Sequence, residues 1–209
     1  GFAILVSLAV WQLQRLAWKE ALIAEMSGRM AAAPVDLPGA PEEAAHGFLS
    51  VLVEGAFVGE PLHVLTSAKP GGPGFRVVRG FETLDGRRIL VDRGYMPEAE
   101  KDAAWAEGRM VVQGTLLWPN ETDSFTPEPN LARNIWFARD LDAMAEALGT
   151  EPLLISAQQP TGEPSPRPLR VGVNLSNNHL QYAITWSLLA VLWLAMTLYL
   201  VYRIRRNSI

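Results

Sequence analysis

One histidine in the sequence stands where a long apolar segment begins, and its neighbours repeat at helical spacing. His179, Tyr182, Ala183 and Trp186 recur at intervals of three, four and seven positions, so a helix would place them on one face. An imidazole nitrogen is a common ligand for metal ions, including tetrapyrrole iron, and the aromatic rings would give this face a flat apolar lining. The alternative is an interfacial polar residue that ends the helix and hydrogen-bonds to Asn177 or to lipid headgroups.

A second cluster, near the start of the chain, combines cations with aromatic residues. Trp11, Arg15, Trp18 and Lys19 recur at spacings of four, seven and eight, which again indicates one helical face. The tryptophans alone, like Tyr182, are typical of an aromatic belt at a membrane interface. The two cations would contact either lipid phosphates or the carboxylates of an amphipathic ligand that lies between the helices.

The segment after His179 predicts a membrane-spanning helix. Residues 180–202 include no charged residue, no Gly and no Pro, and a helix of this length would rise about 35 Å, enough to cross the hydrocarbon core. Asn177 or Asn178 can cap its start. Three arginines at positions 203, 205 and 206 follow its end, which predicts that this end is cytoplasmic.

The first 14 residues predict the outer part of another spanning helix. They are mainly apolar, but 14 helical residues rise only about 21 Å, so we expect further residues upstream. A signal peptide is the alternative, although the small residues at 31–33 lie far from the apolar run and precede Pro34. Two spans would bring residues 11–19 beside residues 177–186 at one membrane face, with both termini in the cytoplasm.

These segments predict four parts of the 209-residue chain. They are a first transmembrane helix at 1–14, an extracytoplasmic domain at 15–178, a second transmembrane helix at 179–202 and a basic cytoplasmic tail at 203–209. The predicted fold class is an α+β membrane protein. Its two transmembrane helices flank an outer antiparallel β-sheet, or partly open barrel, with one short helix.

Short alternating apolar runs separated by turn residues predict the β structure of the outer domain. Asp85-Gly86 between two such runs predicts a tight hairpin. Asp140 as a cap and Gly149 as a stop predict a helix over 140–148. The first helix is expected to continue over 17–29. The expected strands are 48–58, 62–67, 74–83, 87–92, 110–118, 135–138 and 153–156.

Composition and missing motifs exclude several functions. The net charge is −4, and all 22 acidic residues lie between Glu20 and Glu163, so the outer domain lacks the basic character that nucleic acid would require. The sequence has no Cys, which excludes disulfides, thiolate metal sites and c-type heme attachment. Neither a phosphate loop nor a Gly-x-Ser-x-Gly motif is present, and His46 and His63 are isolated. These observations indicate a binding or scaffolding module and no enzyme.

Several blocks, taken in order, resemble one known family. The resemblance is to the Surfeit locus protein 1 family, the cytochrome oxidase assembly factors, and a bacterial member is indicated. Tyr95 is a departure, since the family more often has Trp at that position. The blocks are Trp11–Lys19, Gly55–Phe57, Pro73–Phe75, Leu90–Pro97, Asn134–Asp140 and Asn177–Trp186.

The resemblance implies a two-pass protein of the bacterial inner membrane with a periplasmic main domain. It implies a chaperone role in maturing the heme–copper centre of oxidase subunit I, by holding or delivering heme a, with His179 as the candidate axial ligand of the iron. Expected partners are subunit I, other oxidase assembly factors or heme a synthase, and the lipid bilayer. The alternative is a heme-free scaffold that stabilises an assembly intermediate. The candidate heme contacts are Trp11, Arg15, Lys19, His179, Tyr182 and Trp186.

Overall fold

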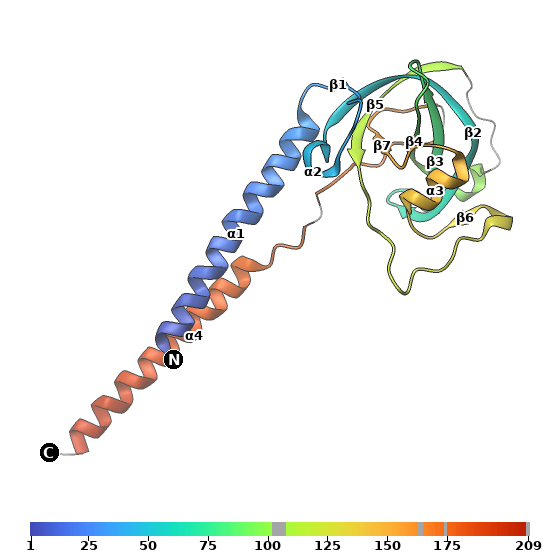
Figure 1. Ribbon diagram of the computed structural model, residues 1–209. Helices are drawn as coiled ribbons and strands as arrows, with labels where there is room; N and C mark the ends of the chain where they lie inside the picture. Colours follow the sequence, from blue (N-terminus) through green and yellow to red (C-terminus); the bar gives the residue numbers. More distant parts are fainter. Residues whose placement is uncertain (102–107, 163–164, 174, 208–209) are drawn as a thin grey trace. The chain divides into compact units, whose positions relative to one another are not determined.

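The computed structural model describes residues 1–101, 108–162, 165–173 and 175–207 (Figure 1). The chain forms two compact units, one made of Gly1–Glu25 and Val173–Ile209 and the other of Met26–Gly172. The boundaries at 14/15 and 178/179 mark predicted membrane segments and stay predictions. The first helix continues past residue 14 without a break, and the Lys19 side chain donates to the backbone carbonyl of Ser176, which ties both residues to the helical unit.

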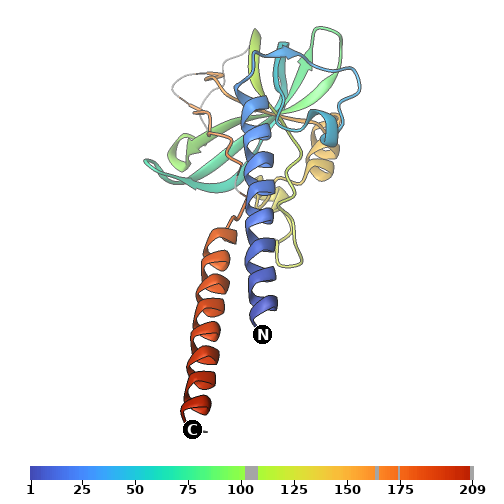
Figure 2. The same cartoon turned by 90° about the vertical axis from the view of Figure 1, so that its left-hand side faces the viewer.

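Two long helices make up the first unit. Helix α1 spans Phe2–Ala31, and helix α4 spans His179–Asn207, beginning at the residue predicted from the sequence. The backbone N–H of Tyr182 donates to the carbonyl of Asn178 at 3.2 Å, which is the first hydrogen bond of α4. The two helices lie side by side in both perpendicular views (Figures 1 and 2). The boundary between the two units falls within α1.

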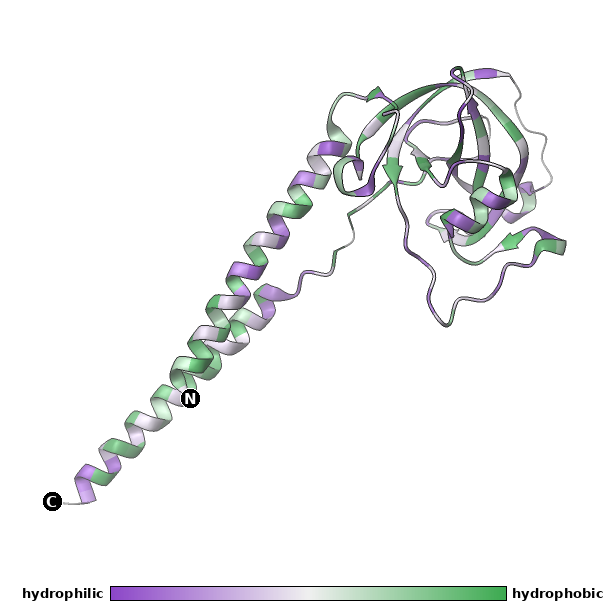
Figure 3. Ribbon diagram, in the orientation of Figure 1, coloured by the Kyte–Doolittle hydropathy of each residue, from purple (hydrophilic) through white to green (hydrophobic). Residues whose placement is uncertain are grey.

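Of the described helices, α4 is the one that is long and apolar enough to cross a membrane. Only 6% of its most apolar stretch is buried in the protein, and hydrophobic residues run along most of its length (Figure 3). Helix α1 is apolar in its N-terminal half but carries Arg15, Lys19 and Glu20 near its middle. One candidate spanning helix is therefore established, and the second span stays a prediction.

The second unit is built on a seven-stranded sheet with short helical segments. Every strand expected from the sequence is present, whereas β1 and α2 were not predicted. The predicted helix at 140–148 is confirmed as α3, with Asp140 accepting from the N–H of Ala143 at 3.1 Å and Gly149 ending it at a φ of 62°. The strands are β1 (Val35–Asp36), β2 (Ser50–Ala68), β3 (Gly72–Thr83), β4 (Arg88–Pro97), β5 (Arg109–Leu117), β6 (Ile135–Trp136) and β7 (Leu154–Ala157), and the short helices are α2 (Glu43–His46) and α3 (Leu141–Leu148), with 3₁₀ turns at Glu98–Glu100 and Leu131–Arg133.

Five of the strands form a ring, because β2 pairs with both β3 and β5. The order around the ring is β2-β3-β4-β7-β5, and the short strands β1 and β6 pair with β2 outside it. The predicted barrel is thus confirmed as a partly ring-like sheet, but the expectation of a purely antiparallel sheet is wrong. Strand β7 runs parallel to β4, since it is reached by a long crossover that includes α3, and β1 and β6 run parallel to β2.

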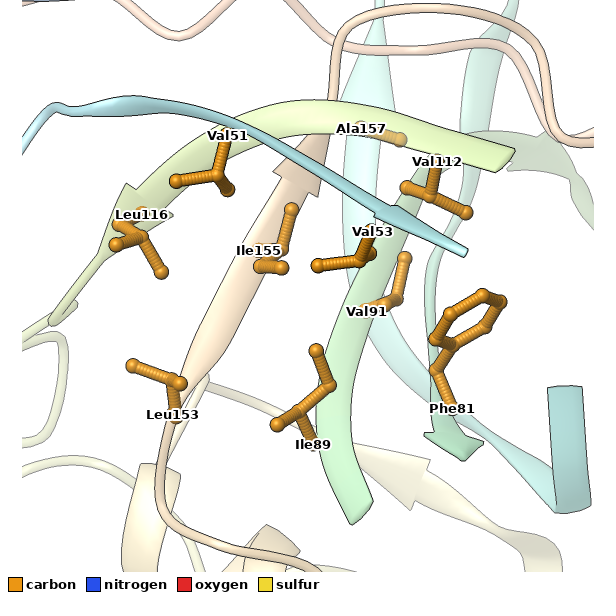
Figure 4. Packing of buried hydrophobic residues seen from close by; sticks show 10 residues of the cluster. All are labelled: Val51, Val53, Phe81, Ile89, Val91, Val112, Leu116, Leu153, Ile155 and Ala157. Carbon is orange, nitrogen blue, oxygen red and sulfur yellow. The ribbon is translucent and has the colours of Figure 1, made fainter. Parts of the chain in front are cut away.

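The inside of the ring is filled by aliphatic side chains that alternate along the strands (Figure 4). Ile89 and Val91 point to this core, as do Val51 and Val53, and each is at most 5% exposed. Burying such a side chain contributes about 1.5–3 kcal/mol relative to leaving it in water. Phe81 is fully buried and meets Phe57 edge-to-face, with 5.1 Å between the ring centroids.

The opposite face of the same strands carries a second apolar cluster. Leu90 and Leu154, which lie between residues of the inner core, pack with Trp136 of β6 and Met144 of α3. Met144 is fully buried, so the short helix α3 contributes a side chain to this apolar cluster. Both faces of β4 and β7 are buried here, and Ile89–Val91 and Leu153–Ile155 are uninterrupted apolar segments.

Candidate functional site

His179, the residue singled out from the sequence, reaches across to the neighbouring helix. Its Nδ1 lies 2.7 Å from Oε1 of Gln12 on α1, and Gln12 is only 8% exposed. The prediction that residues 11–19 and 177–186 lie together is confirmed. Gln12 itself was missed in the sequence analysis. The available signal was a polar residue on the same stripe of the first helix as Ala9 and Leu16.

The helix pair is held close by small side chains. Ala9 on α1 and Ala183 and Ala190 on α4 are all at most 7% exposed, and small residues let two helix backbones approach closely. A Cβ added to Gly1 would lie 2.6 Å from the Trp193 ring, so the N-terminus lies beside the middle of α4. The helices are therefore antiparallel. We call Ala9, Gln12, Ala183 and Ala190 the helix seam.

The two predicted cations have different surroundings. Lys19 faces the chain just before α4, where its ammonium donates to the backbone carbonyl of Ser176. The guanidinium of exposed Arg15 lies 4.2 Å from the ring centroid of Trp18 on its own helix, which is a cation–π contact. The structure brings Lys19 to the α4 side of the unit, while Arg15 lies farther around α1.

The aromatic residues predicted to line the site lie mainly outside the seam. Trp11 is 53% exposed and Tyr182 is 54% exposed, whereas Trp186 is half-buried. Ala183, the small residue on the predicted face of His179, is 3% exposed because α1 covers it. A flat macrocycle would therefore lie on the exposed side of the pair and not over Ala183. The imidazole itself suits an iron atom, since one ring nitrogen is engaged and the other keeps its ligating capacity.

The second unit contains a buried ionic network that joins two of the sequence blocks described above. The side chain of Asp92 is fully buried and accepts from Arg76 at 2.7 Å and from Arg139 at 3.1 Å. Its other oxygen accepts from the backbone N–H of Gly94 at 3.0 Å. Arg139 also pairs with Glu121. Burial alone would raise the pKa of Glu121, but the hydrogen bonds and charge of Arg139 outweigh burial and hold that pKa below its usual value.

Arg93 lies at a β-bulge next to this network and is fully buried. Gly94 pairs with Val77 and Asp92 with Val78, so Arg93 is the extra residue. Its guanidinium donates to the side chain and carbonyl of Thr161 and lies 4.4 Å from the centre of the Phe57 ring. Burial, with a smaller contribution from nearby Arg79, lowers the pKa of Arg93 to about 10, so the group stays charged at neutral pH. The role is structural, because the side chain ties β4 to the segment after β7.

The two remaining histidines also have structural surroundings. His63 in β2 is 4% exposed, and its ring meets Phe75 edge-to-face. Nδ1 of His46 accepts from the backbone N–H of Glu42 at 3.0 Å. Within the described part of the chain, no group of three or more His, Asp or Glu residues is placed to hold a metal ion. A nucleophile with an adjacent base and an orienting group is not assembled among these residues either.

A partly exposed ion pair in the sheet domain provides a pH test. Arg87 binds Glu151 through two hydrogen bonds and also donates to the Pro38 carbonyl at 2.8 Å. The hydrogen bond from Arg87 lowers the pKa of Glu151. Because the pKa of Glu151 is lower in the folded protein than its ordinary value of 4.5, the ion pair stabilises the fold at pH values above 4.5. This stabilisation is lost as the pH falls through the folded-state pKa.

We expect Glu151→Gln to lower the free energy of unfolding by about 0.5–1 kcal/mol at neutral pH, since the glutamate is half-exposed and solvent screens the pair. The difference from the natural chain should vanish near pH 3. Thermal unfolding of the full chain in detergent at both pH values measures it, with the exposed Glu60→Gln as control. A difference that persists unchanged near pH 3 would show that the effect is not due to charge.

The helix pair and the ring-like sheet together define a membrane-associated α+β protein. The family model described as "SURF1 family" matches residues 1–191. Surfeit locus protein 1 of Homo sapiens is 36% identical over 203 residues, covering 86% of this chain and 68% of the human protein. The SURF1-like protein of Rickettsia felis is 28% identical over 220 residues, covering 100% of this chain and 95% of that protein. The SURF1-like protein of Monosiga brevicollis is 30% identical over 213 residues, covering 92% of this chain and 82% of that protein.

The chain belongs to the SURF1 family, as its sequence blocks indicated. The family is known as cytochrome oxidase assembly factors, and its members are membrane-associated proteins. The chain spans about two thirds of the length of the mammalian and Xenopus tropicalis relatives that it matches.

Proposed function

We propose that this protein is a non-enzymatic chaperone that docks on the heme–copper subunit I of a terminal oxidase and holds heme a while the metal centre forms. The observation that best supports heme binding is the contact between His179 and Gln12. It turns the imidazole of His179 toward the other helix and engages only Nδ1. When bound, heme would supply an iron atom that takes an imidazole ligand.

Other side chains of the helical unit fit contact with an amphipathic tetrapyrrole. Trp11 and Tyr182 expose apolar rings, and Trp186 lies half-buried on the turn after Tyr182. Arg15 and Lys19 would bind propionate groups by charge-assisted hydrogen bonds. Lys19 would exchange its present contact with the Ser176 carbonyl for the ligand.

The proposed topology has two spans, with both termini in the cytoplasm and the sheet domain in the periplasm of a bacterial inner membrane. The exposed apolar surface of α4 and the cations at positions 203, 205 and 206 support the orientation of α4. The antiparallel packing of α1 against α4 supports a second span, because it runs along the apolar part of both helices. Heme a synthase and other assembly factors are further proposed partners.

The heme proposal is tested on the full chain, made in cells that synthesise heme a and purified in detergent. We expect His179→Ala to lose the heme absorbance band while the far-UV circular dichroism stays unchanged. His46→Ala is the matched control, since His46 contacts only its own short segment among the described residues, and it should keep the band. An unchanged heme content in His179→Ala would overturn the ligand role.

A heme-free scaffold is the second candidate, and the closed helix seam favours it. Ala183 is covered by α1, so the seam holds the helices together without leaving space there for a ligand. In this role the protein would stabilise an assembly intermediate through protein contacts alone. Co-purification of subunit I with a protein that has no chromophore would support this candidate over the heme chaperone.

A further inference from the structure

Gln12 is a polar side chain in an unusual place. Only Ala9 and Gln12 are buried among the described residues of α1, and an amide removed from solvent costs free energy unless it is hydrogen-bonded. Its Oε1 is 2.7 Å from Nδ1 of His179. The contact gives the buried amide oxygen a partner and holds the imidazole of His179 against α1.

The chemistry of this contact determines which ring nitrogen carries the proton. In the structure the Gln12 carbonyl oxygen faces the ring, and since a carbonyl can only accept, Nδ1 of His179 is the donor in this arrangement. In a neutral imidazole the proton on Nδ1 leaves the lone pair on Nε2. The opposite tautomer would require the Gln12 amide to turn over and present its NH₂ group to Nδ1.

We infer that Gln12 is a positioning residue that holds His179 in the Nδ1-protonated tautomer and so presents Nε2 as the ligating atom. The part that concerns iron rests on the proposed heme function, whereas the tautomer does not. Histidines that bind metals generally donate their second ring N–H to a carbonyl or carboxylate, which fixes the ring and raises its basicity. Gln12 supplies such a carbonyl from the adjacent helix.

The tautomer is measured first, without heme. The full chain, labelled with ¹⁵N-histidine, is studied in detergent micelles at a pH where the ring of His179 is neutral, and His179→Gln assigns its signal among the three histidines. We expect the Nδ1-protonated form in the natural chain and a mixture with the Nε2-protonated form in Gln12→Leu. An Nε2-protonated ring in the natural chain, or no change in Gln12→Leu, would overturn the inference.

Heme retention is measured second, on protein from cells that make heme a. Gln12→Leu should weaken heme binding by about 10–100-fold, the usual effect of removing such a partner. Gln12→Glu keeps an acceptor and should retain heme, with a lower midpoint potential. Gln14→Leu is the control, because Gln14 is exposed on the same helix.

The two ideas fail in different ways. If the natural chain has the expected tautomer but binds no heme, the heme function fails and the positioning role of Gln12 toward His179 survives. If the natural chain binds heme and Gln12→Leu binds it equally well, the positioning role fails and the heme function survives. A merely structural Gln12 would leave the potential of Gln12→Glu unchanged.

Discussion

Asp92→Ala is expected to lower the free energy of unfolding by about 3–5 kcal/mol, because it removes the acidic partner of a buried ionic network. The Asp92 carboxylate is fully buried between the guanidinium groups of Arg76 and Arg139. Without it these two cations would face each other, with Glu121 as the remaining acid that contacts Arg139. The N–H of Gly94 would also lose its acceptor inside the bulge.

The surface pair between Glu82 and Arg88 provides the matched control for this experiment. Both side chains are more than 40% exposed, so Glu82→Ala should cost no more than about 1 kcal/mol. Urea unfolding of the full chain in detergent, followed by tryptophan fluorescence, measures both variants. Asp92→Asn separates charge from shape, since it keeps the size and an acceptor for Gly94. Equal costs for Asp92→Ala and Glu82→Ala would show that the network does not stabilise the domain.

Gly94→Ala is expected to cost about 3–5 kcal/mol, for a reason of backbone geometry. Gly94 has a φ of 101°, which side-chain-bearing residues rarely adopt. A Cβ there would lie 2.0 Å from the carbonyl oxygen of Arg167, which the backbone N–H of Tyr95 binds at 2.7 Å. The segment around Arg167 and Pro168, which is bridged to Tyr95, would have to move away.

Gly59→Ala isolates the part of this cost that comes from φ alone. Gly59 has a φ of 69°, but nothing lies within 4 Å of an added Cβ, so we expect a loss of about 1–2 kcal/mol. The difference between the two alanine variants then measures the clash with Arg167. Thermal unfolding of both variants in the same detergent gives the comparison. Similar losses would mean that the Arg167 segment can shift freely.

Local sequence signals predicted most elements of the fold. Alternating apolar runs placed the strands, and the cap at Asp140 with the stop at Gly149 placed α3. Two expected strands are one long β2, because the chain passes Gly59 and Pro61 with only a register shift between Val58 and Leu62. No local sequence pattern indicates that the two segments form one strand, since the long strand is stabilised by pairing with β3 and β5.

The candidate site could be predicted only in part. The expectation of two spans placed His179 beside the first helix, but the sequence did not indicate which residue of that helix would meet the ring. Gln12 follows from the way the two helices pack, as does the burial of Ala183. The pairing of Asp92 with Arg139 has the same origin, because the residues are 47 positions apart and meet only through tertiary structure.

The closed order of the ring limits how another protein can recognise this domain. Within the described residues, each ring strand is hydrogen-bonded on both sides over part of its length. β6 and the bridge between Tyr95 and Arg167 occupy parts of the remaining edges. An incoming chain would find little backbone to extend as an added strand. Recognition would therefore depend on side chains and connecting segments, which can diverge between relatives while the ring is retained.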